Sequence, residues 1–166
     1  SSLVIDTRDP DVLYAATWQH HRTIAAVIDG GGRTLMPGLI EGHGHLQMNG
    51  SSISDIESNN TWEQLAAQSV VMAKHALMYG FTSWRDAGGM ASGLRKIIDA
   101  GKTPGPRIYP SGGFIGPSGS HADFRALTTP NETFNGPWSS GGRLGISITA
   151  DGVDAIKAAG RQNFMQ

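Results

Sequence analysis

Cysteine is absent from this chain of 166 residues. Disulfide bonds, thiolate nucleophiles and thiolate metal ligands are therefore excluded, and a bound metal would need imidazole nitrogen and oxygen donors. The sequence also lacks a long apolar run, and its first residues show no basic segment followed by an apolar one. We therefore expect neither a membrane span nor a signal peptide.

Charge is low and evenly spread. Lys and Arg number 13 against 14 Asp and Glu, which gives a formal net charge of -1. Because the basic residues form no patch, the sequence gives no reason to expect binding to nucleic acid or to an anionic membrane. With 39% hydrophobic and 16% charged residues, the composition is that of a soluble globular protein. The compartment is left open, with the cytoplasm favoured over secretion.

Helical and extended patterns alternate after a weakly patterned start at residues 1–22. The expected elements are a strand at 39–45, a helix from the Thr61/Gln64 capping box to Gly80, a strand at 81–85, a helix ending at Gly101, a strand at 107–114 and a last helix from about 151. This order predicts an α/β fold with a parallel sheet and right-handed crossovers. The segment 115–148, rich in Gly, Pro and Ser, is expected to be a functional lid or a disordered loop.

Two histidines, His43 and His45, end the strand predicted at 39–45. Side chains alternate along a strand, so both imidazoles point the same way, about 6.5 Å apart along the backbone. One divalent cation can bridge that gap. Gly42 and Gly44 leave the opposite face bare, as expected where another part of the protein crowds the backbone. The alternative is that one imidazole forms a hydrogen bond in the core and the other is solvated.

Three ordered motifs resemble the amidohydrolase superfamily, and more narrowly its imidazolonepropionase-like branch, which includes Xaa-Pro dipeptidases. They are LMPGLIEGHGH at 35–45, GFTSWRDAGG at 80–89 and the run from Gly105-Pro106-Arg107 through His121-Ala122-Asp123. The resemblance covers about residues 24–166. It implies a partial (β/α)8 TIM barrel, with about strands 1–3 and their helices at 35–166. Residues 1–34 would be an N-terminal segment and a possible β-sandwich remnant.

The resemblance also implies a chemistry. In that family the His-x-His pair binds zinc, usually as part of a two-metal centre, and this role falls to His43 and His45. The implied function is a metal-dependent hydrolase of amide bonds in a dipeptide, N-acyl amino acid or cyclic amide, using a metal-activated hydroxide. The family's metal-binding lysine and catalytic aspartate would lie beyond residue 166, so the catalytic residues are unknown. Neither Asp86 nor Asp123 replaces that aspartate.

The chain is therefore expected to be an incomplete fragment that is inactive alone. A complementing chain, a homo-oligomer or missing sequence would supply the remainder. The alternative is a non-catalytic fragment or binding module, because two protein ligands usually give only weak zinc binding. Two departures from the family stand out: Glu41 replaces the usual Asp, and residues 1–22 do not match the expected sandwich strands.

Four further side chains have both a functional and a structural interpretation, and a fifth, His75, has only a structural one. His121 is predicted to contact the substrate or, alternatively, to bond to neighbouring backbone. Arg85 and Asp86 either support the metal ligands or form an ion pair at the barrel rim, and the ion pair is favoured. Trp138 either lines the substrate pocket or anchors its loop by packing. His75 lies off the apolar stripe of its helix and is expected to be solvated.

Overall fold

The structure is a computed structural model that describes residues 2–5, 12–16, 34–48, 55–56, 59–89 and 91–165. Its strands are β1 (Ser2–Ile5), β2 (Val12–Ala16), β3 (Thr34–Pro37), β4 (Leu39–Gly44), β5 (Phe81–Asp86), β6 (Arg107–Pro110), β7 (Phe114–Gly116) and β8 (Ser147–Thr149). Its helices are α2 (Trp62–Met78), α3 (Ala91–Asp99), α4 (Ser140–Arg143) and α5 (Val153–Phe164), with a short 3-10 helix at Glu132–Phe134.

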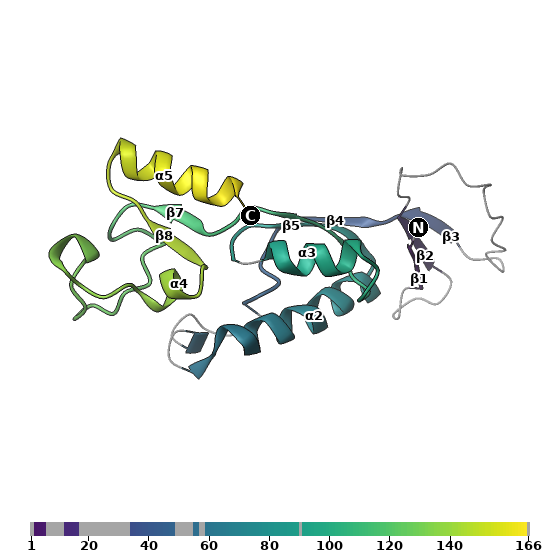
Figure 1. The fold of residues 1–166 in the computed structure, drawn as a ribbon. Coiled ribbons are helices and arrows are strands. Elements are labelled where there is room, and N and C mark those ends of the chain that lie inside the picture. The colour runs from purple at the N-terminus through teal and green to yellow at the C-terminus, as the bar shows by residue number, and fades with distance from the viewer. Residues whose placement is uncertain are drawn as a thin grey trace.

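The central unit is a parallel sheet in the order β4-β5-β6, with α2 and α3 as its crossovers. Both helices lie on the same side of β4 and β5 (Figure 1), as right-handed crossovers require. The predicted parallel β-α-β-α-β order is therefore confirmed. The described chain forms part of an α/β architecture, and the three strands do not close on themselves.

Helix α2 begins and ends where the sequence predicts. The Thr61 hydroxyl accepts a hydrogen bond from the Gln64 backbone N–H at 3.3 Å, as an N-cap residue does. At the other end Gly80 adopts φ 90°, a left-handed conformation that glycine takes without strain. The Gly80 carbonyl accepts from the Leu39 N–H at 2.8 Å, so the end of α2 is tied to the start of β4.

The helix-covered face of this sheet holds the main core. Trp84 of β5 and the 2% exposed Ile108 of β6 pack there against the small side chains of α2 and α3. The opposite face stays open to solvent: Arg85 is exposed, Tyr109 is 50% exposed, and Ile40, which pairs with Ser83, is 75% exposed. Since parallel sheets are normally covered on both faces, the open face lacks its usual cover within the described part of the chain.

The prediction of a single strand at 107–114 is wrong, because the structure has two shorter strands there. They are β6, in the central sheet, and β7, which pairs in parallel with β8 in a separate sheet. The break follows from Pro110, which has no N–H to donate, and from Gly112, which adopts φ 78°. A third sheet, in the order β1-β2-β3, lies near the N-terminus, with β1 antiparallel and β3 parallel to β2.

The last helix, α5, confirms the element predicted from about 151. It is held to the chain before β7 by Asn163, whose side chain accepts from the Gly113 N–H at 3.1 Å and donates to the Gly113 carbonyl at 2.9 Å. Its apolar residues Val153 and Phe164 are 67% and 95% exposed. No helix in the described ranges is long and apolar enough to span a membrane.

Candidate metal centre

His43 and His45 lie at the carboxyl end of β4 and approach each other closely. Their ring centroids are 5.3 Å apart and the ring planes are perpendicular. Pairing with the neighbouring strand continues past the strand end, because the Ala87 N–H donates to the Gly44 carbonyl at 2.8 Å. Leu46 follows at 1% exposure and anchors the backbone in the core. The structure thus brings the two predicted ligands together on an anchored segment.

The environment of His45 favours a neutral imidazole. Burial lowers its pKa below the usual 6.5, the Gly88 carbonyl opposes this effect, and the imidazoles of His43 and His121 lower the pKa further. A neutral ring is the form that binds a metal ion. The Nδ1 atom of His45 is buried and has no hydrogen-bond partner among the described residues. An orphaned nitrogen is costly, and a metal ion nearby would relieve that cost, so the donors fit a divalent cation.

Aromatic rings connect this pair to His121. The ring of Phe114 lies 5.3 Å from that of His45 and 6.3 Å from that of His121, measured between centroids. Phe124 completes the cluster, at 6.0 Å from Phe114 and 6.3 Å from His121. His121 is therefore near His45, and both rings contact Phe114. Sequence reasoning missed both phenylalanines, although Phe114 follows Gly112-Gly113 at the end of a predicted strand.

The described residues supply no complete metal site. Across them, no three His, Asp or Glu side chains come together in a way that could hold an ion. His43 and His45 are thus a pair of donors without a third. His75 is exposed, which confirms its predicted solvation, and Trp138 is 63% exposed, too open to act as a packing anchor.

Arg85 and Asp86 do not pair, so the preferred ion-pair interpretation is wrong. Successive side chains on β5 point to opposite faces, and each of these residues contacts backbone instead. Arg85 donates from Nη1 to the Gly42 carbonyl at 3.0 Å. Asp86 accepts from the N–H of Leu46 at 3.0 Å and from the N–H of Gly88 at 3.3 Å. Burial raises the pKa of Asp86 to about 6, although both amides act to lower it.

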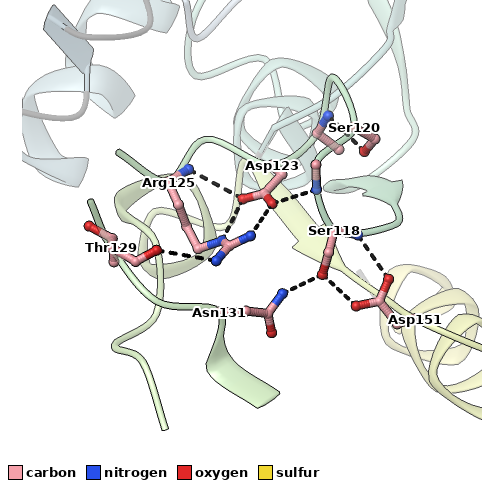
Figure 2. A network of polar contacts seen from close by, with 9 residues as sticks. Ser118, Ser120, Asp123, Arg125, Thr129, Asn131 and Asp151 are labelled. Carbon is pink, nitrogen blue, oxygen red and sulfur yellow. Dashed lines mark hydrogen bonds and ion pairs between the residues drawn. The ribbon is translucent and has the colours of Figure 1, made fainter. Parts of the chain in front are cut away.

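A polar network orders the loop that carries His121 (Figure 2). Asp123 accepts through Oδ2 from the Gly119 N–H at 2.7 Å and from Arg125 Nη2 at 2.5 Å, and through Oδ1 from Arg125 Nε at 2.7 Å. Asp151 accepts from both the backbone N–H and the hydroxyl of Ser118, across 33 positions of sequence. These contacts hold both ends of the turn 118–123, so this part of the loop is ordered rather than disordered.

The Asp123–Arg125 pair predicts a loss of stability in acid. The Arg125 guanidinium lowers the pKa of Asp123 from 3.8 to about 2. Because the folded-state pKa lies below the unfolded one, the stabilisation is complete above about pH 4 and disappears as the pH falls through about 2. Urea unfolding across this range should show that wild type loses more stability than Asp123→Asn. Asp99→Asn, exposed at the end of α3, should keep the wild-type pH dependence. Equal pH profiles for wild type and Asp123→Asn would contradict the assignment.

Comparison with known proteins identifies the class. No family model matches the chain. Ochratoxinase from Aspergillus niger is 29% identical over 76% of this chain and 28% of that protein. The crystal structure of an amidohydrolase superposes with a TM-score of 0.70 and 30% identity, over 88% of this chain and 35% of the other. That of a prolidase complexed with N-methylphosphonate-L-proline gives 0.69 and 30%, over 78% and 31%.

The parallel α/β unit, with histidines at a strand end, is thus homologous to part of the amidohydrolases. Within that class, the relatives it matches include an ochratoxinase and a prolidase. The predicted family resemblance is confirmed. The chain spans about a third or less of the length of each of these relatives.

Proposed function

We propose that this chain is the N-terminal part of a metal-dependent amidohydrolase that hydrolyses amide bonds. In this proposal β4, β5 and β6 are the first three strands of a (β/α)8 barrel formed from residue 35 onward, and residues 1–34 are a remnant of a β-sandwich. The open sheet face is then the inner wall of the barrel. Support comes from the parallel order of the strands and from the carboxyl-end position of the histidines, where such barrels place their chemistry.

His43 and His45 are the proposed zinc ligands, and their adjacent imidazoles are the observation that carries the proposal. When bound, zinc supplies Lewis acidity and lowers the pKa of a coordinated water. The chain's own contribution is to hold two neutral imidazoles on a rigid strand end and to shield His45 from water with Phe114. The complete enzyme would use two divalent ions, with its remaining ligands outside this chain.

The proposed substrate is a small amide, either a dipeptide, an N-acyl amino acid or a cyclic amide. The prolidase structure that superposes on this chain contains a phosphonate analogue carrying proline, which supports a dipeptide-like ligand. His121 is the proposed substrate contact. It is exposed, lies beside the ring cluster of His45 and Phe114, and sits on a turn held at both ends. An imidazole there can donate a hydrogen bond to a polar group of the substrate.

A non-catalytic role for the isolated chain is the second candidate. One observation favours it: the described residues bring together only two strong metal donors, which usually bind zinc weakly. Catalysis then requires a covering partner, either the remainder of the barrel, a complementing chain or a second copy. Such a partner would also cover the open face of the β4-β5-β6 sheet.

The test compares the isolated chain with the protein encoded by the complete reading frame. The complete protein is expected to contain stoichiometric zinc or a similar divalent ion and to hydrolyse Xaa-Pro or N-acyl amino acid substrates. Chelation should remove this activity, and added metal should restore it. The 166-residue chain alone should show no turnover. A complete protein without bound metal, with activity unchanged by His43→Ala, would rule out the proposed enzyme.

A further inference from the structure

Asp86 is a buried carboxylate that accepts hydrogen bonds from two backbone segments next to His45. It is 1% exposed, at the end of β5. Its Oδ2 accepts from the N–H of Leu46, the residue directly after His45, and its Oδ1 accepts from the N–H of Gly88. The Gly88 backbone also faces the His45 imidazole. One carboxylate therefore links the backbone that carries His45 to the backbone that faces its ring.

The chemistry of this link requires a carboxylate. Each oxygen accepts from a different backbone amide, and only an acceptor with two such atoms satisfies both. An asparagine at this position keeps one acceptor and turns an NH2 group toward the other amide. Burying a carboxylate without a cation is costly, and the interactions that hold Asp86 here are backbone amides.

We propose that Asp86 is a positioning residue that fixes the His45 imidazole for metal binding. The inference rests on the proposed function, because it assumes that His45 binds the metal. Asp86 does not contact the metal in this scheme. It sets the distance between the 44–46 segment and the 86–88 segment, which are already joined by the Ala87 N–H to the Gly44 carbonyl. Groups that orient a metal-binding histidine increase the affinity of the site for the metal, even though they do not contact the ion.

The test is a Zn2+ titration of the 166-residue chain, in which calorimetry measures the binding affinity. Wild type should bind Zn2+, and H43A/H45A should not. Asp86→Asn should bind roughly 10–100-fold more weakly, the usual effect of losing a group that orients a histidine ligand. Thr82→Ala is the matched control, because Thr82 is buried on the same face of β5 but lies away from the histidines. It should keep wild-type affinity, even where its free energy of unfolding falls.

The outcomes separate the inference from the proposed function. If wild type and H43A/H45A behave alike, the proposed metal site fails. If wild type binds through the histidines and Asp86→Asn binds equally well, Asp86 has no positioning role. If Asp86→Asn and Thr82→Ala weaken binding to the same extent at the same loss of stability, the role of Asp86 is structural only, which also overturns the inference.

A measurement on the wild-type chain covers the case in which Asp86→Asn does not fold. If the Asp86 link positions His45 for the metal, bound metal must stabilise the link by the same coupling. Amide hydrogen exchange at Leu46 and Gly88 should therefore slow when Zn2+ is added, whereas exchange in the middle of α2 should change less. Unchanged exchange at both amides under saturating Zn2+ would overturn the inference.

Discussion

The double variant H43A/H45A is expected to abolish specific Zn2+ binding by this chain. The two imidazoles are the donors that the described structure brings close together, at 5.3 Å between ring centroids. Each alanine removes one donor, and the described residues offer no third strong donor to compensate. Because the chain has no cysteine, thiolates cannot take over either. Calorimetry or the visible absorption of bound Co2+ measures the loss.

Two single histidine variants serve as controls. His75→Ala removes an exposed imidazole from α2, far along the chain from the pair, and should leave Zn2+ affinity unchanged. His121→Ala should also retain binding, because no three possible metal ligands come together among the described residues and His121 is therefore not a third ligand beside the pair. Strong binding that survives H43A/H45A, or disappears with His75→Ala, would place the metal elsewhere.

Much of this centre could be predicted from local pattern. Alternation along a strand predicts that His43 and His45 share a face, and their rings do lie close together, although the pairing of β4 with β5 shifts register between Glu41 and Gly44. The capping signals around Thr61 and Gly80 define the helix that leads into the next strand. Such features depend on neighbours a few residues away. The sequence therefore predicts the histidine pair and the order of the central elements.

Contacts between distant residues were harder to predict. Asp86 is next to Arg85, and adjacent opposite charges favour an ion pair until the strand places them on opposite faces. The true partner of Asp86, Leu46, lies 40 positions away. The loop network has the same origin, because Ser118 and Asp151 meet across 33 positions. Local composition indicated only a loop rich in Gly, Pro and Ser, since long-range pairing leaves no periodic signal.

Gly44→Ala is expected to destabilise the chain by about 1–3 kcal/mol, the usual cost of overpacking a well-packed site. A Cβ atom at this position would lie 2.2 Å from Cζ2 and 2.6 Å from Cε2 of Trp84. Trp84 cannot easily move away, because it packs into the core formed with α2 and α3. Chemical denaturation measures the change in the free energy of unfolding. Zn2+ affinity should fall as well, since Gly44 lies between the two histidines.

Gly42→Ala is the matched control, two residues earlier on the same strand. A Cβ atom there would meet no atom within 4 Å, so the free energy of unfolding should stay within about 0.5 kcal/mol of wild type. The sequence predicted close approach behind both glycines, and the structure confirms it for Gly44 only. Equal destabilisation by the two variants would show that the loss in the free energy of unfolding comes from the lost backbone freedom of glycine and not from contact with Trp84.

The double variant Gly44→Ala/Trp84→Phe tests the contact directly. Phenylalanine lacks the outer part of the indole ring, so it should make room for the added methyl group. We expect the two changes to be less costly together than the sum of their separate effects, with a coupling of about 0.5–3 kcal/mol. The indole Nε1 is buried without a hydrogen-bond partner among the described residues, so Trp84→Phe breaks no hydrogen bond there. Additive effects would mean that Gly44 is required for a reason other than the indole behind it.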